Sequence, residues 1–233
     1  MKTLVMFVAL VLVSSSAFGV TLFSDDFESG NLDQWQTYYG YPIAELTGDQ
    51  AHSGSSSIRI TQMNQRVGHD FVSSMENVNV SWWFYDNLDL NSYFVSALFE
   101  NNSWGDPYTT VAATDVDANY MVALTRDLRD TTIPRSLGWH KVLMQVRPEG
   151  TIVSLDGGLS FIEPDVPSFT RLYFAEPNYD SGNGTFYIDD VLITDLDGPD
   201  PPGGGDLPGG PVPEPTTLSL VGVGFFLIRR RRR

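Results

Sequence analysis

Residues 78–85 read VNVSWWFY and contain the alternation that decides the fold. Apolar side chains occupy every second position: Val78, Val80, Trp82 and Phe84. A period of two places these side chains on one face of a β-strand and places Trp83 and Tyr85 on the other face. Residues 139–147 repeat the alternation and gather His140 with three apolar residues on one face. Both stretches predict strands that present one face to a core.

Six further stretches show this period and are separated by Gly, Asn, Asp and Pro, the residues of turns. They are residues 57–62, 93–100, 120–125, 151–155, 171–175 and 185–194. The sequence contains neither an amphipathic helical pattern of ten or more residues nor a repeat of 20 to 50 residues. We therefore expect residues 20–196 to form one all-β domain, a two-sheet antiparallel sandwich of the jelly-roll kind.

The charge of the chain is strongly asymmetric. Lys2 and the five arginines at 229–233 hold six of the 14 basic residues, so residues 20–211 carry 8 basic and 28 acidic residues, a net charge of −20. Such a body repels phosphate backbones, and we expect no nucleic-acid partner. The chain has no cysteine, which excludes disulfides, a cysteine nucleophile and cysteine-based metal sites.

The first 19 residues are typical of a secretory signal peptide. Lys2 supplies the positive start, residues 4–13 are almost wholly apolar, and Ala17-Phe18-Gly19 is a small-x-small cleavage site. The alternative, an uncleaved anchor, needs a longer apolar stretch, because ten residues are too few to cross about 30 Å of hydrocarbon.

The C-terminus combines a linker with a short apolar segment. Residues 197–211 contain 11 Gly or Pro residues and predict a flexible linker. Pro213, Glu214 and Pro215 follow, and then come the apolar residues 218–228 and five arginines that include Arg229 and Arg230. The apolar residues predict a short transmembrane helix, and the arginines hold its end at the cytoplasmic face.

Residues 212–233 resemble the PEP-CTERM sorting signal of Gram-negative bacteria. The resemblance rests on Pro213, Glu214 and Pro215, on the short apolar helix, and on the arginine tail. It implies recognition by a membrane exosortase, transient anchoring in the inner membrane, removal of the tail near the motif, and delivery to the cell surface or extracellular matrix. The alternative is a plain membrane anchor followed by basic residues.

Residues 20–196 resemble concanavalin A-like and carbohydrate-binding-module jelly rolls in local stretches. These are residues 23–30 with Trp35, residues 51–60, residues 186–193, and a laminin-G-type hairpin at 138–142 and 153–158. In such domains the first and last strands lie side by side, so acids from both ends of the domain meet.

The jelly-roll resemblance implies a structural calcium site. It assigns ligands to Glu28 and Asp189, with Asp26 and Asp190 as possible additions. Backbone carbonyls around Gly48, Asp49 and Gly54 complete the shell. Oxygen donors of this kind suit Ca²⁺. We prefer Asp189 to Asp190 because period-two spacing places Asp189 on the packed face of Val191 and Ile193, where a carboxylate needs a partner. The alternative is that these are solvated strand-end acids.

The sequence offers no catalytic motif. Concanavalin-like glycosidases carry Glu-x-Asp-x-Glu on one strand, and Glu163-Pro164-Asp165, which comes closest, is interrupted by proline. The three histidines lack metal-ligand spacing, and His140 alternates with core residues. We therefore expect a protein that is not an enzyme.

Exposed aromatic residues are the candidates for ligand binding. Trp104 and Tyr108 lie in a predicted loop rich in Asn and Asp, and Trp83 with Tyr85 faces away from the core. A flat ring beside amide groups suits the apolar face of a sugar. The alternative is that the loop rings close the end of the sandwich. We expect an exported, non-catalytic surface or matrix protein that binds polysaccharide. A purely structural acidic protein without a ligand is the alternative, and a glycan-cleaving enzyme is the third reading.

Overall fold

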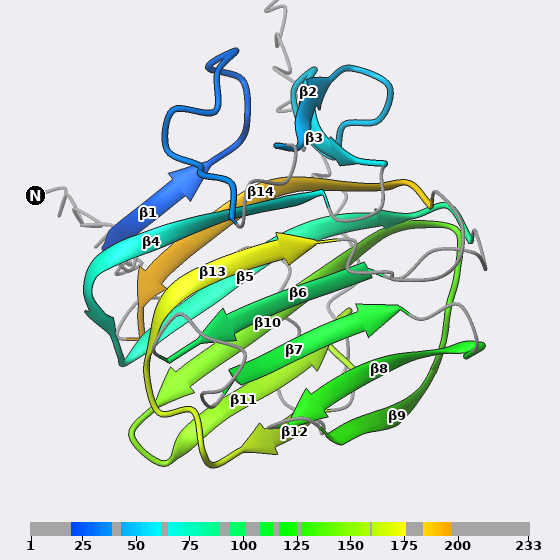
Figure 1. Cartoon of the computed structure of the whole chain (residues 1–233). Coiled ribbons are helices and arrows are strands. Elements are labelled where there is room, and N and C mark those ends of the chain that lie inside the picture. Colours follow the sequence, from blue (N-terminus) through cyan, green and yellow to red (C-terminus); the bar gives the residue numbers. More distant parts are fainter. Residues whose placement is uncertain are drawn as a thin grey trace, which may run out of the picture.

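The computed structural model describes residues 20–38, 43–61, 65–88, 94–100, 108–113, 117–124, 127–158, 160–175 and 184–196. Within these ranges the chain forms fourteen β-strands and no helix (Figure 1). The strands are β1 (Thr21–Asp25), β2 (Glu45–Thr47), β3 (Ser57–Ile60), β4 (Arg66–Met75), β5 (Val78–Asp86), β6 (Phe94–Phe99), β7 (Tyr108–Ala113), β8 (Asn119–Leu124), β9 (Asp127–Pro134), β10 (Gly138–Arg147), β11 (Gly150–Leu155), β12 (Ser160–Glu163), β13 (Phe169–Ala175) and β14 (Phe186–Asp195).

The strands form two antiparallel sheets packed face to face (Figure 1). One sheet has eight strands in the order β12-β11-β10-β5-β14-β3-β2, with β1 also paired to β14. The other sheet has six strands in the order β4-β13-β6-β7-β8-β9. The structure thus confirms the predicted all-β two-sheet sandwich, and it pairs the first strand with the last.

The core between the sheets follows the alternation of β5 and β10. Trp82 lies opposite Val142 and Phe84 lies opposite His140, so each pair faces the same side of the eight-stranded sheet. The Trp82 ring meets Phe174 of the second sheet with ring centres 5.5 Å apart. Burial of each large apolar side chain stabilises the fold by roughly 1.5–3 kcal/mol, so this seam contributes much of the stability.

The sequence patterns missed several strands, among them β7. Tyr108 was expected in a loop, and this expectation is wrong, because Tyr108 is the first residue of β7. All six residues of β7 are buried, as are those of the neighbouring β6. Strands that are covered on both faces show no alternation between apolar and polar residues, and YTTVAA therefore gives no period-two signal.

Candidate functional site

A bulge in β14 decides where its acids point. Asp189 pairs with Trp83, but the register shifts before Leu192, which pairs with Ser81. Asp190 has φ of 48°, in the left-handed region, which is typical of a β-bulge. Asp189 therefore shares the outward face of Trp83, whereas Ile193 pairs with Val80 on the core face. The predicted placement of Asp189 beside Val191 and Ile193 is wrong, because the extra residue reverses the alternation.

Asp189 is covered by the segment that precedes β3. Its Oδ2 accepts backbone N–H groups from His52 at 2.7 Å and Ser53 at 3.2 Å, and its Oδ1 accepts the Asp190 N–H at 2.7 Å. The residue is 0% exposed. Burial raises the pKa of Asp189 to about 6, although the three N–H donors lower it. Burial therefore disfavours the charged form of the Asp189 carboxylate more than its hydrogen bonds favour it.

Glu28 binds the same segment from another side. Its carboxylate accepts the N–H groups of Ser55 at 2.7 Å and Ser56 at 2.6 Å, and the Ser55 hydroxyl at 2.8 Å. These donors, the Ser55 N–H first, hold the pKa of Glu28 below its ordinary value. Gly54 has φ of +59°, and a Cβ there would lie 2.5 Å from Glu28 Oε1. Glu28 and Asp189 thus hold one turn, residues 52–56, against the sheet through hydrogen bonds to its backbone.

These positions fit part of what a calcium ion requires. Two carboxylates converge on one turn, and a cation would supply the positive charge that buried Asp189 lacks. Among the described residues, however, no three acidic or histidine side chains cluster as a metal site. Asp26 Oδ1 accepts the Glu28 N–H at 3.2 Å, and Asp49 pairs with Arg59 at 2.6 Å. A calcium ion would therefore rest on Glu28, Asp189 and backbone carbonyls, and its binding stays a prediction.

Asp190 contacts the same turn and orients an aromatic ring on it. Its carboxylate contacts His52 Nδ1 at 2.5 Å and accepts the Ser53 hydroxyl at 2.6 Å. His52 in turn stacks on Trp83, with ring centres 3.8 Å apart and planes 15° apart. The contacts fix both rings in place above the eight-stranded sheet.

Five rings form a continuous surface on this sheet, here called the outer aromatic strip. Its members are His52, Trp83, Tyr85, Trp139 and Tyr187. Trp139 and Tyr187 flank Tyr85 on the adjacent strands β10 and β14, with ring centres 5.5 and 5.9 Å from it. All five residues are partly exposed. Four of them stand on paired strands, so strand pairing sets their spacing. Tyr85 stands nearly perpendicular to Trp139 and Tyr187, with ring planes 71° and 84° apart, so the strip presents ring edges as well as ring faces to solvent.

A pocket of about 520 Å³ adjoins the strip. Its walls include Trp83, His52, Lys141, Asp26 and Asp190, together with hydroxyl groups such as that of Ser81. Lys141 is only 6% exposed, and its Nζ lies 5.9 Å from the centre of the Trp83 ring. A concave site with an aromatic wall and a few convergent polar groups is typical of small-molecule and sugar sites.

The structure gathers some predicted residues and separates others. Trp83, Asp26 and Asp190 meet at the pocket, and Tyr85 lies in the adjoining strip. Tyr108 is buried in a separate apolar cluster with Phe99 of the other sheet. Trp104 lies outside the described residues, as do the signal peptide, the linker, and the sorting residues Pro213, Glu214, Pro215, Arg229 and Arg230.

Trp139, Tyr187, His52 and Lys141 belong to the site but were not predicted. Trp139 and Lys141 alternate with core residues along β10, so their outward direction could be read from the sequence. Their position beside Trp83 and Tyr85 could not, because it depends on which strands pair and in which register.

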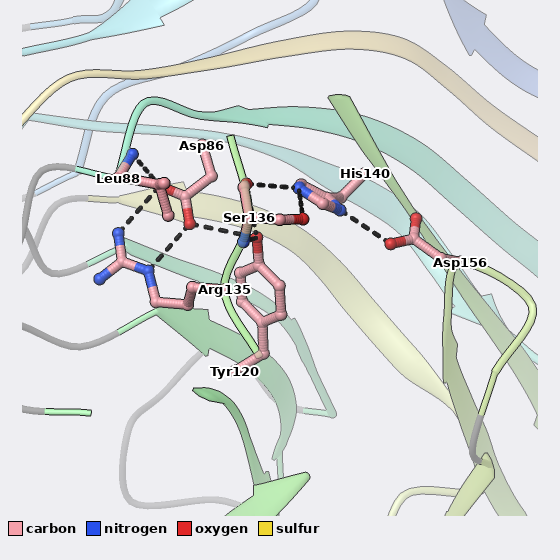
Figure 2. Close-up of polar contacts among 7 residues, drawn as sticks. All are labelled: Asp86, Leu88, Tyr120, Arg135, Ser136, His140 and Asp156. Carbon is pink, nitrogen blue, oxygen red and sulfur yellow. Dashed lines mark hydrogen bonds and ion pairs between the residues drawn. The ribbon is translucent and has the colours of Figure 1, made fainter. Parts of the chain in front are cut away.

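A second polar cluster lies at the end of β5, where Asp86 is the last residue of the strand. Figure 2 shows Asp86 at its centre, accepting two hydrogen bonds of 2.9 Å from Arg135. The Tyr120 hydroxyl and the Leu88 N–H donate to the same carboxylate at 3.1 and 2.7 Å. Asp86 stands on β5 and Tyr120 on β8, so the cluster joins the two sheets.

Ser136, His140 and Asp156 beside this cluster have the order of a catalytic triad but not its chemistry (Figure 2). His140 Nδ1 lies 2.7 Å from Asp156, and Nε2 lies 2.8 Å from the Ser136 carbonyl oxygen and 3.3 Å from its hydroxyl. Carboxylate and carbonyl oxygens only accept, so this geometry favours a proton on each ring nitrogen. Burial lowers the pKa of His140, but these acceptors raise it more, and the pKa lies above its ordinary value. A doubly protonated ring cannot serve as a general base.

Solved structures share the architecture of this domain, a two-sheet β-sandwich. One is "Cellulose induced protein, Cip1", with 17% identity and a TM-score of 0.53, covering 74% of this chain and 96% of that one. Another is the receptor binding domain of botulinum neurotoxin D, with 12% identity and a TM-score of 0.52 over 75% of this chain. This chain spans 48% of the length of the toxin domain. At these identities the similarity defines the fold alone.

The C-terminal residues identify the sorting route. Residues 211–233 match the PEP-CTERM protein-sorting motif, which confirms the resemblance found in the sequence. The motif implies export, transient membrane association and exosortase processing. In the part of the chain that the structure describes, no helix is long and apolar enough to cross a membrane. The predicted membrane helix lies outside that part, and no curated protein matches the chain.

Proposed function

We propose that this chain is a non-catalytic protein of the cell surface or extracellular matrix that binds polysaccharide through the outer aromatic strip and the adjoining pocket. The strip carries the proposal. Trp139 and Tyr85 present ring surface from paired strands, and such rings contact the apolar C–H faces of pyranose sugars. The pocket beside them supplies the hydroxyl, carboxylate and ammonium groups that hydrogen-bond sugar hydroxyls.

The preorganisation of the strip supports binding rather than a packing role alone. His52 is fixed on Trp83 by Asp190, and Tyr85 is held between neighbours on both adjacent strands. Side chains that are already ordered lose little conformational entropy when a ligand arrives. Rings that merely closed the sandwich would lie between the sheets, whereas these five lie on the outer face.

The proposal that the protein is not an enzyme rests on how its acids are used. Glu163, from the stretch that came closest to a glycosidase motif, is 2% exposed, and its Oε1 accepts the Asp165 N–H in a turn. His140 Nδ1 and Nε2 lie 2.7 and 2.8 Å from the acceptors Asp156 and the Ser136 carbonyl, which favour the protonated ring. These groups are engaged in structural contacts and are not poised for proton transfer.

Retention on the exopolysaccharide of the producing cell tests the binding proposal. We expect the full-length chain, purified in detergent, to be retained, and Trp139→Leu to bind about tenfold more weakly, because it keeps apolar volume but loses the flat ring. Leu137→Ala is the matched control, since Leu137 is 62% exposed and outside the strip. Equal retention of Trp139→Leu and wild type, or no retention of either, would favour the purely structural reading.

Two further measurements separate the remaining readings. Release of reducing sugar from the same polysaccharide would support a glycan-cleaving enzyme and contradict the proposal. Deletion of residues 212–233 should abolish delivery to the surface or matrix. If delivery persists without them, the destination does not depend on the sorting motif.

A further inference from the structure

The pocket beside the outer aromatic strip is lined by more acidic than basic side chains. Asp25, Asp26 and Asp190 line it, and Lys141 is the cation among its lining residues, with His52 paired to Asp190. Residues 20–211 as a whole carry a net charge of −20. A carboxylate on a ligand would therefore enter a negative region of a negative protein.

The carboxylates differ in their role. Asp25 is buried and committed to the fold, since it accepts the Phe27 N–H at 2.8 Å and the Trp35 indole N–H at 2.7 Å. Asp190 is held by His52 and Ser53. Asp26 lines the pocket and is exposed, and its Oδ1 accepts the Glu28 N–H at 3.2 Å, which leaves Oδ2 without a hydrogen-bond partner among the residues that the structure describes. Carboxylate oxygens accept hydrogen bonds from sugar hydroxyls but repel a uronate.

Lys141 does not reverse this balance. Its side chain is almost fully buried, and its ammonium lies over the Trp83 ring. In this position it offsets one of three carboxylates. Hydroxyl and amide groups from Ser24, Ser81 and Gln34 complete the lining, and these groups recognise uncharged sugars.

We infer that the pocket takes an uncharged pyranose residue and rejects acidic sugars such as uronates. The inference rests on the proposed function, because it names the glycan class that the same site binds. It assigns the aromatic strip to the sugar rings and the pocket to discrimination against charge.

A matched pair of modified glycans tests this inference. One batch of the exopolysaccharide that retains the protein is carboxymethylated, and a second is hydroxyethylated to the same degree, so that the pair differs in charge and little in size. Binding of the full-length chain in detergent is measured with a chelator present, because calcium would bridge carboxylates. We expect at least about tenfold weaker binding to the carboxymethylated sample at low salt, and a smaller difference at high salt as charges are screened.

A substitution of Asp26 locates the effect. Asp26→Asn should reduce the preference for the hydroxyethylated over the carboxymethylated sample about threefold, whatever it does to the binding of both samples alike. Asp33→Asn is the matched control, an equal charge change at an exposed residue outside the pocket lining. Equal or stronger binding to the carboxymethylated sample would overturn the inference while leaving the proposed function intact. Failure to bind even the unmodified polysaccharide would overturn both.

Discussion

The ion pair between Asp86 and Arg135 offers a sharp test of how the sandwich is held together. The two side chains are 0% and 2% exposed and share two hydrogen bonds of 2.9 Å. Arg135→Met removes the positive charge and leaves the Asp86 carboxylate buried. Breaking a buried pair in this way costs about 3–5 kcal/mol. We expect the lower end, about 3 kcal/mol, because Tyr120 and Leu88 still donate to Asp86.

Urea unfolding and thermal melting measure this loss. For a domain of this size, about 3 kcal/mol corresponds to a fall in Tm of roughly 6–12 °C. Arg135→Lys should lie between wild type and Arg135→Met, because it keeps the charge but loses the paired geometry. Arg59→Met is the control: Arg59 pairs with Glu45 and Asp49 at the surface, where all three side chains are at least 31% exposed, and such pairs contribute at most about 1 kcal/mol. A loss below about 1 kcal/mol for Arg135→Met, or equal losses for Arg135→Met and Arg59→Met, would refute the reasoning.

Three further predictions concern the charge of His140, the proposed calcium site, and the turn at residues 52–56. The folded-state pKa of His140 lies above 6.5, so its contribution to stability is present below pH 6.5 and is lost as pH rises through the folded-state pKa. His140→Gln should therefore make the fall of Tm between pH 6 and 9 less steep. An unchanged dependence of Tm on pH contradicts this prediction. Calcium at 1 mM should raise Tm at pH 7.5 but not at pH 5, because Asp189, with its pKa of about 6, is mostly protonated at pH 5. Glu28→Gln should abolish the rise at pH 7.5. A Tm that calcium leaves unchanged at both pH values argues against the site. Gly54→Ala should destabilise the fold by about 1–3 kcal/mol, because its φ is +59° and an added Cβ would contact Glu28. Gly30→Ala is the control, because an added Cβ there contacts nothing within 4 Å, and it should reduce the stability less. Equal losses of stability would show that the contact with Glu28 is unimportant.

The sequence predicted β5 and β10, whose residues alternate between the core and the outer face, and it missed β7, which is buried on both faces. Trp82 and Phe84 alternate with Trp83 and Tyr85, so both the strand and its orientation were evident from the order of residues. In β7, Thr109 and Thr110 are as buried as Val111, and no pattern of polarity marks that strand. Periodicity detects a difference between two faces, so it gave no signal for β7, although it did mark the equally buried β6 at residues 93–100.

The site was predicted less completely than the fold for a related reason. Asp189 and Asp190 were recognised as acids at a strand end, but one bulge turned Asp189 to the opposite face. Trp139 reaches Tyr85 only through the pairing of β10 with β5. Register and bulges depend on the whole sheet, and the local sequence specifies neither.

The same contacts that stabilise the turn before β3 also order the proposed binding surface. Asp189 holds the backbone of His52, while Asp190 holds its ring against Trp83. The bulge at Asp190 is what allows two consecutive acids to face one turn, because on a regular strand adjacent side chains point to opposite faces. Loosening the turn would therefore release the His52 ring from the strip. Preorganisation of the proposed glycan-binding surface then depends on the acids beneath it as well as on the aromatic residues of the strip.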